Sequence, residues 1–167
     1  DQLRAVKGSF RSALQSSQNC KEVGIPVFAN TQINQRNIHE LSELSAIFAE
    51  VGIKEWQVQI TGPMGRAADR PEWLLQPWQI LEVLDELADI KTEILMDAHQ
   101  RGIAPQKVMN VTMGNNVGYY GPHEHLLRSS PGIAAKAWHG CQAGKYTLGI
   151  ESDGKIKGCP SLPSAPY

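Results

Sequence analysis

The order of helix, glycine and strand constrains the fold of this chain more than any other feature. Apolar residues recur at helical spacing, a glycine follows, and a short run of β-forming residues comes next. This order occurs three times: helices over residues 8–23, 37–51 and 77–101, glycines at 24, 52 and 102, and strands over 26–33, 53–60 and 107–112. Repeated units of this kind predict an α/β fold with a parallel sheet.

Local signals place the helix ends and two unusual loops. Asn37 with Glu40 three residues later forms a capping-box pattern at the start of the second helix. Residues 61–75 form a long irregular segment after the second strand, and residues 113–120 are rich in Gly and Asn after the third. Both segments leave the carboxyl ends of strands, where parallel sheets carry their active sites.

Composition excludes several classes of protein. Among 167 residues the formal net charge is −1, so the sequence has no electrostatic footprint for nucleic acid or an anionic membrane. No stretch approaches the roughly 20 apolar residues that span a bilayer. The first residues lack the layout of a signal peptide, which favours a cytoplasmic protein, and the missing initiator Met suggests that the chain starts inside a longer protein.

The three cysteines are too few for a disulfide scaffold. Cys20 lies in the first helical pattern and is predicted to be a small buried hydrophobe. Cys141 and Cys159 are separated by 17 residues that include the turn Asp153-Gly154. From spacing alone they are structural cysteines, half of a metal site or a disulfide. A further alternative is a small zinc site that combines them with nearby histidines, namely His123, His125 and His139.

The segment Cys141–Cys159 resembles the opening of a SPASM domain, the auxiliary iron–sulfur domain of many radical S-adenosylmethionine (SAM) enzymes. That pattern has a cysteine, about a dozen residues, a glycine, four residues and a second cysteine, and here Gly154 stands at the glycine position. Upstream stretches resemble successive parts of the same family's barrel, in the expected order: residues 1–10, 25–37, 56–67 and 118–121.

The resemblance implies a partial TIM-like (β/α) barrel fragment followed by a small β-hairpin region. Residues 1–120 would be the second half of the barrel, 121–140 a linker with a short helix, and 141–167 a truncated SPASM-like hairpin. The family's CxxxCxxC motif is absent from the sequence and would lie before Asp1. The expected parent is an oxidoreductase that cleaves SAM reductively and abstracts hydrogen from a peptide or small-molecule substrate.

The same resemblance implies particular ligands for the cofactors. Asn30 and Thr31, Gln59 and the loop residue Arg66 would contact SAM, and Cys141 and Cys159 would hold part of a 4Fe–4S cluster. The residues themselves leave other roles open, because strand-end amides satisfy backbone groups, interior-facing glutamines line a barrel and loop arginines form salt bridges. No catalytic residue is predicted. The isolated chain is expected to be inactive and to bind neither cofactor stoichiometrically.

A non-catalytic alternative follows from the strand edges. Three parallel strands cut from a barrel expose unpaired N–H and C=O groups at their edges. We therefore expect a homo-oligomer that covers these edges, and a self-associating structural or binding module is the alternative to an enzyme.

Overall fold

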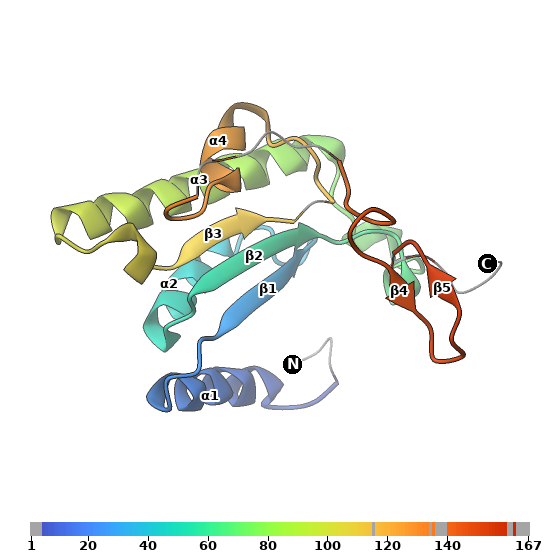
Figure 1. Cartoon of the computed structure of the whole chain (residues 1–167), viewed down its shortest axis with the longest axis horizontal. Helices are drawn as coiled ribbons and strands as arrows, with labels where there is room; N and C mark the ends of the chain where they lie inside the picture. Colours follow the sequence, from blue (N-terminus) through green and yellow to red (C-terminus); the bar gives the residue numbers. More distant parts are fainter. Residues whose placement is uncertain (1–4, 115, 134, 136–139, 160–161, 163–167) are drawn as a thin grey trace.

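The computed structural model describes residues 5–114, 116–133, 135, 140–159 and 162, with the Arg66 side chain left out (Figure 1). The elements in chain order are α1 (Ser9–Glu22), β1 (Phe28–Ile33), α2 (Leu41–Val51), β2 (Glu55–Ile60), η1 (Gly65–Ala67), η2 (Pro71–Trp73), α3 (Pro77–Gln100), η3 (Pro105–Lys107), β3 (Asn110–Met113), η4 (Gly121–His123), α4 (Glu124–Arg128), β4 (Gly149–Ile150) and β5 (Ile156–Lys157).

The sheet confirms the predicted α/β fold. Its strands run parallel in the order β1-β2-β3, with helices between successive strands. The register pairs Asn30 with Gln57 and Gln57 with Thr112. These strands do not close into a barrel, and a separate antiparallel pair, β4 and β5, follows them.

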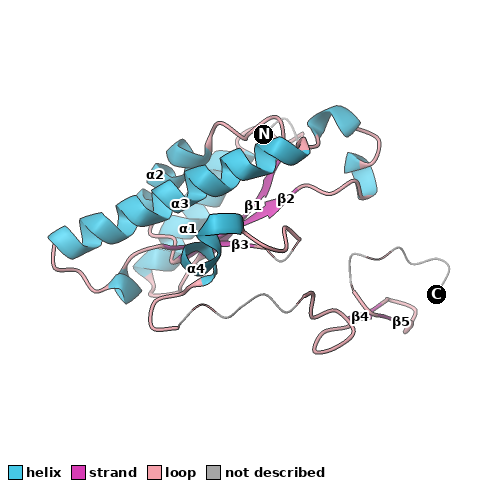
Figure 2. Ribbon diagram, turned by 90° about the horizontal axis from the view of Figure 1, so that it is seen from above, coloured by secondary structure: helices cyan, strands magenta, loops and turns pink. Residues whose placement is uncertain are grey.

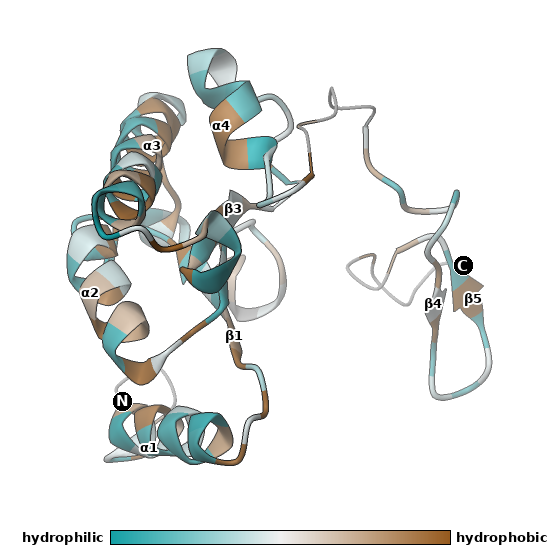
Figure 3. Ribbon diagram, turned by 60° about the vertical axis from the view of Figure 1, so that its left-hand side comes forward, coloured by the Kyte–Doolittle hydropathy of each residue, from teal (hydrophilic) through white to brown (hydrophobic). Residues whose placement is uncertain are grey.

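Helices α2 and α3 cover one face of the sheet (Figure 3). The side chains that meet there are apolar and buried: Trp56, Val58, Leu87 and Val111 have no exposed surface. Burying side chains of this size is worth about 1.5–3 kcal/mol each before conformational entropy is subtracted. The opposite face has no α-helix over it within the described residues, and apart from Phe28 its side chains are polar and, except for Asn110, at least partly exposed.

Glycines end the helices as predicted. At the end of α2, Gly52 has φ = 80°, and its N–H donates to the carbonyl of Ala49. Ile53 N–H then donates to Phe48, so the chain leaves the helix with its last carbonyls satisfied. Gly102 adopts φ = 63° after α3 in the same way. A side chain at either position would strain the left-handed backbone that turns the chain toward the next strand.

Several predicted details were wrong. Asn37 does not cap α2, which begins at Leu41; its side chain instead bonds the backbone of Gln32 and Asn34 within the preceding turns. The third strand is Asn110–Met113 rather than 107–112, because Pro105 starts a 3₁₀ turn that ends at Lys107. Cys20 was predicted to be buried but is only half-buried, like the other partly covered residues of α1, none of which is fully buried.

The outer edge of β3 is already hydrogen-bonded. Asn110 N–H donates to the carbonyl of Lys54, just before β2, and Gly114 N–H donates to Val58 in β2. The alternating pattern of parallel strands therefore turns the carbonyls of Val111 and Met113 outward. The buried ammonium of Lys91 donates to the Val111 carbonyl at 2.9 Å. The Tyr120 hydroxyl donates to the Met113 carbonyl at 2.8 Å. Side chains therefore occupy the positions that a further strand would need.

An ion pair holds Tyr120 in this position. Glu124 accepts a hydrogen bond from the Tyr120 N–H at 2.9 Å and pairs with Arg128, whose guanidinium lies 4.1 Å from the centre of the Tyr120 ring. Burial raises the pKa of the Tyr120 hydroxyl, the nearby Arg128 charge opposes that effect, and the net shift is upward. The hydroxyl thus remains a donor to the end of β3 across the neutral pH range.

The β4–β5 hairpin stands apart from the layered part of the chain (Figure 2). Its strands have two residues each, joined through the Asp153-Gly154 turn that the sequence predicts. Within the residues that the structure describes, no helix has the length and apolar character needed to cross a membrane.

Candidate functional site

The uncovered face of the sheet carries the candidate site. Because side chains alternate along a strand, every second residue of each strand lies on this face. Two rows cross the sheet in register from β1 through β2 to β3, namely Phe28, Glu55 and Asn110, and Asn30, Gln57 and Thr112. A third row pairs Gln32 with Gln59, which lies beside the glycine at 114 just after β3. Apart from the glycine, two of these rows carry only amide and hydroxyl side chains. Polar groups that come together in this way are typical of a polar ligand site.

Four amide side chains form a connected ladder on this face. Asn30 donates from Nδ2 to Oε1 of Gln57 at 2.9 Å, and Gln59 donates from Nε2 to the same oxygen at 3.1 Å. Gln32 donates to Oε1 of Gln59 at 2.7 Å. Within the described residues, Gln57 Nε2 remains a donor without a protein partner, and Asn30 Oδ1 and Gln32 Oε1 remain acceptors. A ligand that combines hydroxyl and carboxylate or carbonyl groups could bond all three.

Glycine at position 114 lets the ladder lie close to β3. A Cβ built there would lie 2.6 Å from Cγ of Gln59, well inside van der Waals contact. Because position 114 carries no side chain, the Gln59 side chain has room to lie against the end of β3. Beside it, Asn116 donates to the carbonyl of Ile60 at 2.6 Å and ties the loop after β3 to the end of β2.

The SAM-contacting residues implied by the resemblance do not all share this face. Asn30 and Gln59 belong to the ladder. Thr31 lies on the helix-covered side, where its hydroxyl accepts a hydrogen bond from the Trp56 indole at 2.9 Å. Arg66 lies in η1, beyond the carboxyl end of β2, and its side chain is outside the described part. The structure thus brings Asn30 and Gln59 together and places Thr31 behind them.

Loop contacts at the carboxyl end of the sheet were not predicted from the sequence. Arg36 and Arg70 both lie over the ring of Trp73, at 5.2 and 4.5 Å from its centre. Gln35 N–H donates to the Trp73 carbonyl at 2.9 Å, which joins the loop after β1 to the 61–75 loop. Stacked arginines beside a tryptophan are a recurrent arrangement, but the two arginines come from separate loops, so spacing alone gave no signal.

The cysteines lie outside the sheet. Cys141 is exposed, Cys159 is half-buried, and neither forms a disulfide. Among the described residues no three His, Cys, Asp or Glu side chains come together as a metal site. His123 bonds Asp85 at 2.7 Å, and His139, part of the zinc alternative, lies outside the described residues. Two cysteines do not complete the four-ligand set of a 4Fe–4S cluster.

Comparison with known proteins gives a distant and partial similarity. No family model matches the sequence. Over 91 residues the chain is 24% identical to the AdoMet-dependent heme synthase of Nitratidesulfovibrio vulgaris. The matched segment covers 54% of this chain and 25% of the relative, so it spans about a quarter of the relative's length.

Proposed function

We propose that this chain is part of a radical SAM oxidoreductase and that the amide ladder on the open sheet face holds SAM. The ladder is the observation that carries the proposal, because one of its amide nitrogens and two of its amide oxygens have no protein partner within the described residues. The similarity to an enzyme named for AdoMet, which is SAM, supports the same cofactor. The location on a parallel sheet also agrees with where such folds bind ligands.

The proposed contacts follow from the free groups of the ladder. Ribose hydroxyls of SAM would donate to Asn30 Oδ1 and Gln32 Oε1, and Gln57 Nε2 would donate to a SAM oxygen. Arg66 is proposed for the methionyl carboxylate because its loop leaves the end of β2 and a guanidinium pairs well with a carboxylate. Thr31 has an indirect role, since it fixes Trp56 beneath the ladder.

The proposal extends only to binding. When SAM is held beside a reduced 4Fe–4S cluster, the pair supplies a 5′-deoxyadenosyl radical. We propose a peptide or a small molecule as the substrate from which the parent enzyme abstracts hydrogen. The described residues do not complete a ligand set for such a cluster. No reaction step is therefore assigned to residues of this chain.

A titration followed by NMR tests the ladder directly. We expect SAM to shift the side-chain NH₂ signals of Asn30 and Gln57 with a dissociation constant on the order of 1 mM, because the cluster contact is missing. Gln57→Leu removes the free donor and should weaken binding about fivefold or more. Gly114→Ala should act similarly by displacing Gln59.

Gln100→Leu is the matched control, since Gln100 is exposed at the end of α3, away from the ladder. It should leave the affinity unchanged. Binding that is equal in native and Gln57→Leu protein, or shifts confined to residues outside the open face, would refute the proposed site.

Self-association is a second proposed property, and the sheet edges favour it. The β3 edge is capped by Lys91 and Tyr120, whereas β1 borders exposed apolar residues: Val23, Ile25 and Phe28 are 71%, 55% and 62% exposed. We propose that two copies pair antiparallel along the first half of β1, from Phe28 to Asn30, because the Gln32 carbonyl already accepts a hydrogen bond from Asn37. A single usable edge produces a closed dimer rather than a filament.

Light scattering across a concentration series tests this pairing. We expect native protein to approach twice the monomer mass at high micromolar concentration, and Phe28→Lys to stay monomeric. Ile156→Lys is the control, because Ile156 is equally exposed at 67% but lies in the hairpin. A native monomer at these concentrations, or equal behaviour of both variants, would refute pairing through β1.

A further inference from the structure

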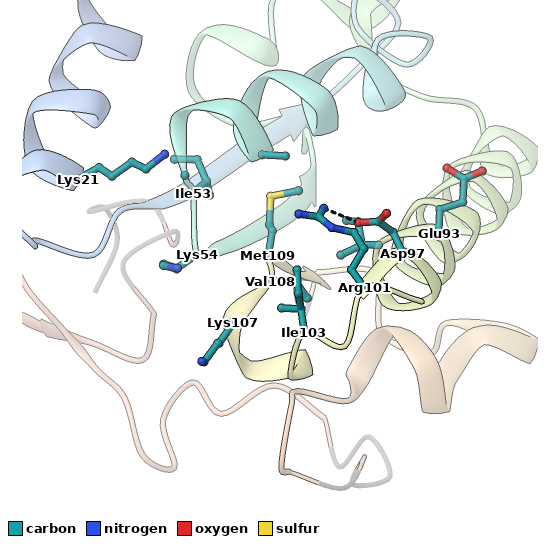
Figure 4. A pocket seen from close by; sticks show the side chains of 13 residues that line it. Lys21, Ile53, Lys54, Glu93, Asp97, Arg101, Ile103, Lys107, Val108 and Met109 are labelled. Atoms are coloured by element: carbon teal, nitrogen blue, oxygen red, sulfur yellow. Dashed lines mark hydrogen bonds and ion pairs between the residues drawn. The ribbon is translucent and has the colours of Figure 1, made fainter. Parts of the chain in front are cut away.

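A pocket of about 550 Å³ lies at the amino ends of β2 and β3, away from the carboxyl-end loops (Figure 4). The final turns of α2 and α3 and the 3₁₀ turn η3 surround it, and Lys21 reaches it from α1. Its volume is within the range of small-molecule sites. The pocket shares no residue with the amide ladder.

The floor of the pocket is apolar. Ile53 and Met109 are 5% and 7% exposed and belong to the hydrophobic core. Ile94, Ile103 and Val108 also line the pocket and add to its apolar surface. A hydrocarbon or aromatic group placed on this floor would remove apolar area from water, at about 25 cal/mol for each Å².

Two cations at the opening are already satisfied. The Lys21 side chain crosses the bare Cα of Gly52, and its ammonium lies 3.4 Å from the carbonyl of Glu50 at the carboxyl end of α2. There it offsets the negative end of the helix dipole. Arg101 pairs with Asp97 at 2.9 Å within the last turn of α3.

Two other cations are exposed and have no ion-pair partner within the described residues. They are Lys54 and Lys107, which line the same pocket. Figure 4 shows the side chains of Lys54 and Lys107 on the same side of the pocket residues, whereas Glu93 lies on the opposite side. The pocket thus presents two unpaired positive charges beside an apolar floor.

We propose that this pocket binds a medium-chain aliphatic carboxylate, with the chain on the apolar floor and the carboxylate between Lys54 and Lys107. Charge complementarity identifies the head group of the ligand as an anion. The two ammonium groups would repel a cationic head group, and a neutral head group would leave both of them without a counter-charge. The apolar floor identifies the tail. The proposal is independent of SAM binding, since it involves the opposite end of the sheet.

Octanoate is the test ligand, and backbone amide shifts of Ile53, Ile103 and Met109 report its binding. We expect saturable shifts at these residues. Octanamide, which has the same chain and a neutral head, should bind at least fivefold more weakly, and 0.5 M NaCl should reduce the difference.

The double variant Lys54→Gln/Lys107→Gln should weaken octanoate binding about tenfold while leaving octanamide binding unchanged. Lys145→Gln is the control, because Lys145 is an exposed lysine in the hairpin region. Absence of octanoate shifts, equal affinity for octanoate and octanamide, or an unaffected double variant would each overturn the proposal. Shifts at Asn30 or Gln57 instead would show that the ligand occupies the ladder.

Discussion

The parallel sheet and the β4–β5 hairpin differ in how far their apolar side chains are buried. In the sheet, Trp56 and Val58 on β2 have no exposed surface. In the hairpin region, Ile150, Ile156 and Tyr146 are 71%, 67% and 86% exposed. Both regions have paired strands and a glycine turn, but only the sheet buries apolar surface.

The difference shows what backbone pairing alone provides. An isolated two-stranded hairpin is at best marginally stable in water. Here Asp153 pairs with Lys155 at 2.9 Å with both side chains exposed, a contact worth little, and Glu151 pairs with the more covered Lys157. The hairpin therefore has little apolar burial of its own to stabilise it, whereas the sheet is stabilised through burial.

Removing Trp56 should have the largest effect. Trp56→Ala empties a buried site that contacts Phe48 edge to face and loses the bond to Thr31, so we expect a loss of about 3–5 kcal/mol in unfolding free energy. Urea unfolding followed by circular dichroism measures this loss.

Ile156→Ala should change the same free energy by less than about 0.5 kcal/mol, because its side chain is already in water. A comparable loss in both variants would mean that the hairpin packs as tightly as the sheet, and the contrast between the two regions would fail.

Lys91 should give the next largest effect, expressed as a pH dependence. Burial lowers the pKa of its ammonium to about 8, and the charge of Glu55 opposes that shift. Between pH 8 and 10.5 the unfolded chain therefore binds more protons than the folded chain, so stability due to Lys91 rises with pH, by up to about 3 kcal/mol.

The comparison is with Lys91→Met, since all other titrating groups are common to both proteins. The difference in unfolding free energy between native protein and variant should shift in favour of native protein from pH 7 to pH 10. A difference that stays constant with pH would show that the ammonium is not desolvated at the β3 edge.

The cysteines should give the smallest effect. Cys141→Ser/Cys159→Ser should change the unfolding free energy of the sheet by less than about 0.5 kcal/mol, because neither thiol contributes to the buried cluster. In hydrogen exchange, the amide of Ile156 should exchange far faster than that of Val58 in both proteins. A loss above 1 kcal/mol would indicate that the hairpin and the sheet unfold together.

The fold was largely predictable because its signals are local. Helical spacing and the glycines at 52 and 102 specify where each helix ends, and the chain must then turn toward a strand. Asn37 misled the prediction because an asparagine side chain bonds backbone groups equally well in a turn and at a helix cap. Boundaries depend on which of these two bonds the surrounding structure favours.

The candidate site was only partly predictable. Asn30 and Thr31 are neighbours in one strand, so the two-residue repeat places them on opposite faces. Lys91 gave no signal, because its partners Val111 and Ser129 lie 20 and 38 residues away. The domain boundaries and the SPASM-like role of the hairpin remain predictions.

The amide ladder has a direction, and this has a consequence for selectivity. Oε1 of Gln57 accepts hydrogen bonds from both Asn30 and Gln59. The orientation in which Gln59 donates to Gln57 is also the one in which its own Oε1 accepts from Gln32. Rotating Gln57 or Gln59 alone by half a turn would place donor against donor, and rotating Asn30 or Gln32 alone would place acceptor against acceptor. The four side chains must therefore reorient together or not at all, and a guest molecule that needs the opposite polarity meets the resistance of the whole row.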